Sequence, residues 1–513
     1  MIDLSLQQIE NKRIELQASL DSIRTRIERN RLGQFATPMP LAQEIMRHVS
    51  TFFNPDQKIR FMEPAFGTGS FYSALLNTFE KNRIQKTIAY EIDAEYWQVA
   101  RNLWEQTTLT LHLADFTRSI PPSPTAGRYN LVISNPPYVR HHHLSNQDKK
   151  RLQTATQNVF GKKLSGLAGL YCYFIGLSHD WMEDGGIAGW LIPSEFMDVN
   201  YGGVIRDYLT SKITLLQIHR FNPDDTQFDD ALVSSSVVFF KKEPPAKDHQ
   251  VLFTYGGSLS KPEISRFLPL ENLKHKEKWG RITLNGISQR TDKASALSNF
   301  FDIRRGLATG ENKFFILTRE QIAARQIPWQ FLKPILPSPR YLEVEDIQAD
   351  EKGIPLINRQ LFLLDCNLPE REVSIQYPSL WNYYQEGLNN GIGNAYLCKH
   401  RKPWYSQEKR EAPLFACTYV GRITEKKQSP FRFILNRSQA TITNSFLGLY
   451  PKKELHLAIK KRPDLIDIIW RKLNEIPPHL LINEGRVYGG GMYKIEPKEL
   501  GKVPMVQMSE FLR

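Results

Sequence analysis

The sequence predicts an α/β fold in its first half, with helices covering a doubly wound, mainly parallel sheet. Four strand-like apolar runs alternate with helical patterns between residues 58 and 134. Each run ends at a polar residue, and these residues are spaced by 28, 24 and 20 positions, the length of one strand-plus-helix unit. Ligands of such sheets bind beyond the carboxyl ends of the strands. The predicted site residues are Glu63, Glu91, Asp115 and Asn135.

Local patterns justify each element of this sheet. A glycine-containing turn at 65–71 follows the first strand, and a helix is expected at 72–82. The second, third and fourth strands follow in chain order, and the fourth ends in two prolines that stiffen the next loop. The expected strands are 58–64, 87–93, 109–116 and 129–133.

Residues 1–32 are predicted to form an amphipathic helix. Apolar residues recur with heptad spacing, and Arg13 interrupts their stripe. We expect the stripe to pack on the body of the chain rather than on another chain. Its members are Ile2, Leu6, Ile9, Leu16, Leu20, Ile23 and Ile27.

The charge distribution divides the chain into a neutral and a basic half. Residues 1–250 hold 27 Lys and Arg against 27 Asp and Glu, whereas residues 251–513 hold 40 against 27 and carry the whole net charge of +13. The basic half therefore suits a polyanion, with a solvated basic surface as the alternative. A polar, proline-containing stretch at 241–250 predicts a boundary, which gives domains 1–32, 33–245 and 246–513.

Several classes of protein are disfavoured by what the sequence lacks. The four cysteines include no CxxC pair, which predicts reduced thiols in the cytoplasm. No run of 18 apolar residues occurs, so neither a membrane span nor a secretory signal is expected. The consecutive histidines His141–His143 cannot all face one metal ion, so we expect no metal site. Phosphate or base contact and a solvated loop remain the two interpretations of this segment.

The residues at the predicted site favour an adenosine-containing cofactor without a phosphate cradle. Gly67 and Gly69 allow the backbone a sharp turn and a close approach to a ligand. No GxGxxG or GK[ST] pattern is present, which disfavours dinucleotides and nucleoside triphosphates. Glu91 is placed to accept from ribose hydroxyls and Asp115 from an adenine amine, with Phe116 against the ring. S-adenosylmethionine fits these features, although single strand-end acids also serve as solvated or helix-capping groups.

An ordered set of motifs resembles one enzyme family. In chain order these motifs are "GQFATP", "EPAFGTG", "YEID", "ADF" and "NPPY". This order resembles the gamma group of DNA amino-methyltransferases, the TaqI-type adenine-N6 enzymes. The resemblance implies a Rossmann-like S-adenosylmethionine-dependent methyltransferase domain followed by an α+β target-recognition domain. It also implies a place in a restriction–modification or related defence system.

The resemblance implies roles for the matching residues. Thr37 and Pro38 would close over the methionine end of the cofactor, Ile92 would lie beside its adenine, and Phe228 would stack on the target base opposite Tyr138. The residues implied to contact the cofactor are Thr37, Pro38, Glu63, Pro64, Ala65, Gly67, Glu91, Ile92, Asp115, Phe116 and Asn135.

The "NPPY" loop can activate an exocyclic amine. The lone pair of that amine is delocalised into its base, and two acceptors aimed at its N–H bonds would free it. The side-chain oxygen of Asn135 and the carbonyl of Pro136 can be these acceptors, while Pro136 and Pro137 stiffen the loop. Tyr138 offers a ring for stacking, and the base must leave the duplex to reach this loop.

The partners and alternatives follow from the same residues. We expect double-stranded DNA as substrate, a monomer in solution, and a cognate restriction endonuclease that shares the site without a stable complex. The same loop suits cytosine N4, and RNA or protein-glutamine methyltransferases also carry it. A binding module without catalysis and a fused nuclease are disfavoured by the intact motifs and the absence of PD…ExK spacing. Candidate DNA-contacting residues are Arg304, Arg305, Lys399, Arg401, Lys402, Lys426, Lys427 and Arg486, with Tyr405 and Tyr488 as aromatic neighbours or core residues.

Overall fold

A computed structural model describes residues 4–123, 127–222, 227, 234–274, 278–280, 295–424, 429–488 and 491–505. The chain divides into two compact units, a first unit of Met1–Ser288 with Tyr488–Gly490, and a second unit of Gln289–Val487 with Gly491–Arg513. Each unit is described by itself below. Within the described residues, no helix is both long and apolar enough to cross a lipid bilayer.

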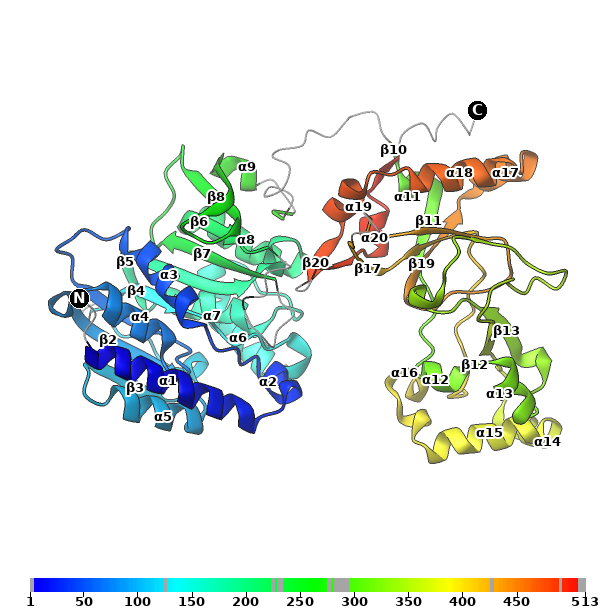
Figure 1. The fold of residues 1–513 in the computed structure, drawn as a ribbon, viewed down its shortest axis with the longest axis horizontal. Coiled ribbons are helices and arrows are strands. Elements are labelled where there is room, and N and C mark those ends of the chain that lie inside the picture. Colours follow the sequence, from blue (N-terminus) through cyan, green and yellow to red (C-terminus); the bar gives the residue numbers. More distant parts are fainter. Residues whose placement is uncertain are drawn as a thin grey trace. The chain divides into compact units, whose positions relative to one another are not determined.

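The first unit is built on one nine-stranded sheet of described residues (Figure 1). Its order is β3-β2-β1-β4-β5-β7-β6-β8-β9, in which β1 to β5 run parallel and β7 is antiparallel to both neighbours. The strands are β1 (Ile59–Glu63), β2 (Ile84–Glu91), β3 (Leu109–Leu113), β4 (Tyr129–Ser134), β5 (Met182–Pro193), β6 (Thr214–Arg220), β7 (Ser235–Lys241), β8 (Gln250–Gly257) and β9 (Pro262–Pro269). The predicted α/β class with a mainly parallel sheet is confirmed.

Helices cover both faces of this sheet because successive strand residues point to opposite sides. Phe61 packs in a core with α3, α4 and α5, whereas the adjacent Met62 packs in a core with α6, α7 and α8. The helices are α1 (Leu4–Ile23), α2 (Arg26–Leu32), α3 (Met39–Ser50), α4 (Ser70–Thr78), α5 (Ala94–Trp104), α6 (Asn146–Phe160), α7 (Leu170–His179), α8 (Gly203–Ser211) and α9 (Leu270–Lys274).

The N-terminal segment forms two helices instead of the one expected over 1–32. Thr25 caps α2 in a capping box with Glu28, which ends α1 at Ile23. The heptad stripe also fails at Ile23, which is 66% exposed, because a straight helix drifts relative to a 3.5-residue repeat. Arg13, expected to break the stripe, is instead 2% exposed at its centre.

The boundary between the two compact units lies later in the chain than residues 245 and 246, where it was expected. Strand β8 pairs with β6 in parallel, and β9 pairs with β8, so residues 250–269 extend the first sheet. The proline-containing stretch before them is therefore a connection within this sheet, and the units divide between Ser288 and Gln289.

The second unit combines small sheets with short helices, in agreement with the α+β class expected for it. A five-stranded sheet has the order β11-β19-β16-β18-β14, and a three-stranded sheet has the order β12-β15-β13. The strands are β10 (Ser295–Ala296), β11 (Phe301–Arg305), β12 (Ile316–Leu317), β13 (Leu332–Ile335), β14 (Asp346–Ile347), β15 (Leu361–Leu364), β16 (Phe415–Thr418), β17 (Val420–Arg422), β18 (Phe433–Asn436), β19 (Phe446–Pro451), β20 (Arg486–Tyr488), β21 (Met492–Lys494) and β22 (Pro504–Met505). The helices are α11 (Leu297–Phe300), α12 (Asn312–Phe315), α13 (Arg319–Ala324), α14 (Glu370–Gln376), α15 (Pro378–Asn389), α16 (Tyr396–Lys399), α17 (Lys453–Lys461), α18 (Leu465–Asn474), α19 (Pro478–Glu484) and α20 (Pro497–Leu500).

Candidate active site

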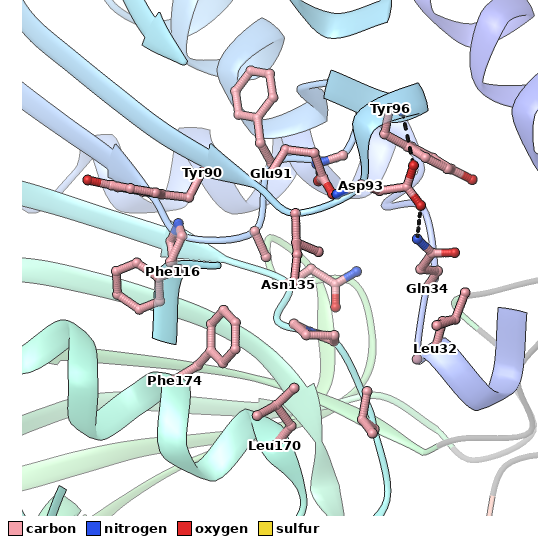
Figure 2. A pocket seen from close by; sticks show the side chains of 18 of the residues that line it. Leu32, Gln34, Tyr90, Glu91, Asp93, Tyr96, Phe116, Asn135, Leu170 and Phe174 are labelled. Atoms are coloured by element: carbon pink, nitrogen blue, oxygen red, sulfur yellow. Dashed lines mark hydrogen bonds between the residues drawn. The ribbon is translucent and has the colours of Figure 1, made fainter. Parts of the chain in front are cut away.

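A cavity of about 580 Å³ lies at the carboxyl ends of the parallel strands. The chain leaves β1 towards β2 and β3 and returns on the other side at β4, so the strand order reverses here. Figure 2 shows Glu91 and Asn135 facing the same space, with Phe116 and Phe174 on one side and Gln34 on the other. The predicted residues that line the cavity are Thr37, Glu63, Pro64, Ala65, Gly67, Glu91, Ile92, Asp115, Phe116, Asn135 and Pro137.

The glycine-containing loop after β1 presents bare backbone to the cavity. Gly67 has a φ of +59°, and a Cβ added to it would meet no atom within 4 Å. Gly69 has a φ of +92°, and its Cβ would lie 2.7 Å from both the Phe66 ring and the Trp104 indole nitrogen. The two glycines therefore serve different purposes, because Gly67 borders open space and Gly69 allows close packing.

Glu91, at the end of β2, is held by the backbone on both carboxylate oxygens. Oε2 accepts from the Gly67 amide at 2.8 Å, and Oε1 accepts from the Asp93 amide at 2.8 Å. Burial raises the pKa of Glu91 to about 7, although these amide hydrogen bonds favour the charged form. A carboxylate oxygen can accept a further hydrogen bond, so both oxygens remain able to bind ligand hydroxyls.

Glu63, at the end of β1, has a buried carboxyl oxygen without a hydrogen-bond partner in the described chain. Among the described residues nothing donates to its Oε2. Burial raises the pKa of this carboxyl well above its ordinary value, and the Arg13 guanidinium opposes the shift. A buried, unpaired carboxyl oxygen is costly, and a donating or cationic group such as the ammonium of a methionine moiety would satisfy it.

The end of β3 forms a slot with an apolar wall. Asp115 Oδ1 accepts from the Thr117 amide at 2.9 Å and from its hydroxyl at 2.7 Å. The Phe116 ring is 3% exposed, and its centroid lies 5.4 Å from that of Phe174. Ile92, from the end of β2, is 69% exposed beside the cavity. An acceptor, aromatic rings and an apolar side chain together suit a purine ring.

Asn135, at the end of β4, has its amide fixed in one orientation. Nδ2 donates to the Phe35 carbonyl at 2.8 Å and to Thr37 Oγ1 at 3.1 Å. A carbonyl can only accept, so it must face the amide nitrogen rather than the amide oxygen. The Asn135 Oδ1 is buried and has no hydrogen-bond partner within the described chain. The segment around Thr37 thus orients a hydrogen-bond acceptor whose own partner is missing.

Three predicted residues stand beside the cavity without lining it, namely Pro38, Pro136 and Tyr138. Tyr138 is 7% exposed, and its hydroxyl donates to the Leu191 carbonyl at 3.1 Å. Burial raises the pKa of Tyr138, so this hydroxyl stays protonated. Phe228, expected to stack opposite Tyr138, lies outside the described residues.

Gly33, the first residue of the "GQFATP" motif, was given no role of its own by the sequence reasoning. Its φ is +65°, and a Cβ there would lie 2.4 Å from the Tyr138 amide nitrogen. The Tyr138 amide donates to the Gly33 carbonyl at 3.1 Å. Only glycine allows this contact, which brings the segment carrying Phe35 and Thr37 onto the "NPPY" loop.

The N-terminal helix α1 also lines the cavity, through Gln17 and Asp21. Gln17 accepts from the Thr68 hydroxyl at 2.7 Å and donates to Asp21 Oδ1 at 3.0 Å. The Tyr96 hydroxyl donates to the same Asp21 oxygen at 2.8 Å, and Arg13 donates to Thr68 Oγ1 at 3.0 Å. The four-residue spacing of Arg13, Gln17 and Asp21 puts them on one helix face, a signal that could have identified this wall.

The basic candidates of the second unit differ in their surroundings. Tyr405 is fully buried and stacks on Tyr384 with ring centroids 4.0 Å apart, so it is a core residue. The Arg486 guanidinium pairs with Glu499 at 2.9 Å. Lys426 and Lys427 lie outside the described residues. The His141–His143 segment forms a short 3-10 helix, and no cluster of three metal-ligating side chains occurs in the described chain.

Two family models match the chain. The model described as Eco57I restriction-modification methylase matches residues 2–228, and the model of the Type II methyltransferase M.Eco57I, C-terminal domain, matches residues 280–512. The two matches are consecutive and together span most of the chain. The first of them contains all residues that line the cavity.

Relatives of known identity match over nearly the whole chain. Type II methyltransferase M.AccI of Acinetobacter calcoaceticus is 24% identical over 94% of this chain and 86% of its own length. Type II methyltransferase M.XamI of Xanthomonas campestris pv. amaranthicola is 26% identical over 92% of this chain and 85% of its own length.

Solved structures share the fold at low identity. The Type IIL restriction-modification enzyme MmeI, solved in complex with DNA, is 12% identical, with a TM-score of 0.59 over 95% of this chain and 70% of that chain. The DrdV–DNA complex gives a TM-score of 0.51 at 12% identity, over 92% of this chain and 56% of that chain. Together with the family models, the relatives and the strand-end site, they identify the chain as a member of the Eco57I restriction–modification methylase family, a gamma-class, S-adenosylmethionine-dependent DNA methyltransferase with a C-terminal recognition domain.

Proposed function

We propose that the protein methylates the N6 amine of adenine in double-stranded DNA, at a specific sequence and on a base flipped out of the duplex. The observation that carries this proposal is Asn135 Oδ1, a buried acceptor with no partner among the described residues. It belongs to an amide that Phe35 and Thr37 hold from the other side. An acceptor fixed in this way suits a substrate that brings N–H donors, such as an exocyclic amine.

The cavity fits the cofactor that the family uses. Gly67 presents open backbone, Glu63 offers an unpaired oxygen, Glu91 can accept from ribose hydroxyls, and Asp115 with Phe116 suits an adenine. Thr37, Pro38, Pro64, Ala65 and Ile92 complete the proposed cofactor contacts. S-adenosylmethionine bound there would supply an electrophilic methyl group that needs no activation by the protein.

The chain's own residues act on the target amine. Hydrogen bonds from the amine to Asn135 Oδ1 and to the Pro136 carbonyl would draw its hydrogens out of the plane of the base and free its lone pair. The Phe35 carbonyl and Thr37 Oγ1, which accept from the Asn135 amide nitrogen, keep its Oδ1 in place before the base arrives, so little reorganisation accompanies the reaction. Pro136 and Pro137 hold the loop stiff. Tyr138 and Phe228 are the proposed stacking partners of the base.

Burial of the acceptor supports base flipping. Asn135 Oδ1 lies beneath the protein surface, and a base stacked within a duplex cannot reach such an atom. The second unit, which holds the excess of Lys and Arg, is the proposed reader of the DNA sequence. A cognate endonuclease is part of the proposal because the similar proteins are named as Type II methyltransferases. A monomeric state is proposed as well.

Expression in a host without endogenous DNA methylation tests this function. Single-molecule sequencing of the host DNA should report N6-methyladenine at one recurring sequence. Asn135→Ala should leave no modified base, whereas Asn102→Ala, a change on the exposed side of α5, should match the unaltered protein. Modification of cytosine N4 would show that the target base is cytosine rather than adenine. Unmodified DNA in the presence of folded protein would contradict the proposed function.

A further inference from the structure

Two loops of the second unit form one platform. Residues 306–313 and 396–402 meet where Arg401 donates from Nη2 to the Ala308 carbonyl at 2.7 Å and from Nη1 to the Thr309 carbonyl at 2.6 Å. Gln407 Oε1 accepts from the same guanidinium at 3.2 Å. Arg401, a candidate DNA-contacting residue from the sequence, therefore uses its donors to join the two loops.

Close packing fixes this loop pair further. Gly310 has a φ of +97°, and a Cβ there would lie 2.8 Å from Cys398 Sγ. Helix α16 forms residues 396–399 of the second segment, and α12 begins at Asn312 within the first; Figure 1 labels both helices. Leu307, Phe314 and Cys398 belong to one buried core beneath the loops. Hydrogen bonds and close packing therefore hold the two segments against each other.

An aromatic ring stands exposed on this platform. Tyr396 is 77% exposed, an unusual state for a large aromatic side chain. Its ring lies 4.7 Å from that of His400, whose Nδ1 donates to the Tyr396 carbonyl at 2.7 Å. The ring is thus supported by its own helix and presented to the surroundings rather than buried in a core.

The same two segments carry lysines without an ion-pair partner among the described residues. Lys313, Lys399 and Lys402 are exposed, and in the described part of the chain no carboxylate lies within 4 Å of their ammonium groups. Glu311 is the one acidic residue in the two loops, and its Oε1 accepts from the Lys313 amide at 3.3 Å. The platform therefore carries three exposed cations and one exposed aromatic ring.

We propose that this platform, residues 306–313 and 396–402, binds the sugar–phosphate backbone of duplex DNA. Lys313, Lys399 and Lys402 pair with phosphates, and Tyr396 packs on an adjacent sugar. Cations with an interleaved aromatic ring suit a polyanion whose charges repeat along a sugar chain. The inference rests on the proposed function and adds its partner surface. Phosphate contacts position a protein on DNA without reading its sequence, so the platform positions the duplex.

The test uses the full-length protein and a short duplex of random sequence, with affinity measured by fluorescence anisotropy over a range of salt concentrations. The triple variant Lys313→Ala, Lys399→Ala and Lys402→Ala should flatten the log–log salt dependence by about 0.9 for each lysine removed. Its matched control replaces Lys453, Lys460 and Lys461 of α17 with alanine, which removes the same charge elsewhere in the unit. The control should keep the slope of the unaltered protein.

A second comparison isolates the ring. Tyr396→Ala should weaken binding about five- to thirtyfold, as loss of roughly 1–2 kcal/mol of ring packing implies, while Trp329→Ala, which removes another exposed ring, should not. Equal salt slopes in the platform triple variant and the unaltered protein would overturn the inference, as would equal slope changes in both triple variants. Unchanged S-adenosylmethionine affinity verifies folding of each variant. Failure of the proposed function would appear separately, as absence of methylated DNA with the unaltered protein.

Discussion

The polar side chains at the ends of β2 and β3 differ from the one at the end of β4 in whether the chain itself supplies hydrogen-bond donors to their oxygens. Glu91 and Asp115 accept hydrogen bonds from backbone amides of the chain. Asn135 Oδ1 has no partner among the described residues. In the proposed function, the protein therefore assembles the adenosine side of the cavity by itself, whereas the side proposed to bind the amine keeps an acceptor without a partner in the described chain. Changes on the two sides should consequently affect different measurements.

Asn135→Ala should have the largest effect, on turnover alone. Removal of one preorganised hydrogen-bonding group from a reacting centre typically lowers turnover about 10²- to 10³-fold. Methyl transfer in single-turnover experiments should fall by this factor, while S-adenosylmethionine affinity stays within about twofold. If cofactor affinity drops as steeply as turnover, Asn135 belongs to the cofactor side and the comparison fails.

Glu91→Ala should act on the opposite side. Loss of two charge-assisted hydrogen bonds costs roughly 2–3 kcal/mol, which corresponds to about 30- to 150-fold weaker S-adenosylmethionine binding. Calorimetric titration measures this effect, with Glu105→Ala, an exposed change at the end of α5, as the control. Unaltered S-adenosylmethionine affinity in Glu91→Ala would show that this carboxylate does not bind the adenosine.

Acidification should weaken cofactor binding before it affects the fold. The pKa of Glu91 is raised to about 7, so its carboxyl is charged above this pH and protonated below it. In the proposed site, ribose hydroxyls would donate to the charged form, and affinity should therefore fall by up to about tenfold for each pH unit below 7. Glu91→Gln should bind weakly and show a flatter pH dependence over this range. An identical pH profile in Glu91→Gln would assign the titration to another group, such as Glu63.

Tyr96→Phe should have the smallest effect on cofactor affinity. It removes a hydrogen bond that holds α1 beside the cavity, but it removes no group proposed to contact the cofactor. It removes one hydrogen bond of 2.8 Å to Asp21, worth about 1 kcal/mol, and cofactor affinity should fall about fivefold. Faster cofactor dissociation in stopped-flow fluorescence would show that α1 retains the ligand. No change in dissociation rate would limit α1 to a structural role.

Sequence reasoning located the strand-end residues because parallel βα units leave their carboxyl ends on one edge. Glu63, Glu91, Asp115 and Asn135 all line the cavity for this reason. The same reasoning missed Gly33, whose requirement arises from contact with a residue about a hundred positions away. Apolar spacing likewise located α1 but not its polar face of Arg13, Gln17 and Asp21. The heptad pattern registers only apolar residues, so Arg13 counted as an interruption rather than as part of a second face.

The second unit was the least predictable region. Its short strands and helices lack the regular spacing of the first sheet, so charge was the main available signal. Charge alone did not separate Arg401, which joins two loops, from the exposed Lys399 two positions earlier. Both residues contribute equally to composition, and only the carbonyl oxygens that surround Arg401 distinguish their roles.

The most direct test of the central claim is a double-mutant cycle between Asn135 and the target amine. Once sequencing has identified the site, the unaltered protein and Asn135→Ala are titrated with duplexes that carry either adenine or purine, which lacks the amine, at the target position. If Asn135 Oδ1 accepts an amine hydrogen, the unaltered protein should prefer adenine by about fivefold, as expected for roughly 1 kcal/mol, and Asn135→Ala should bind both duplexes equally. An equal preference for adenine in both proteins would contradict the account.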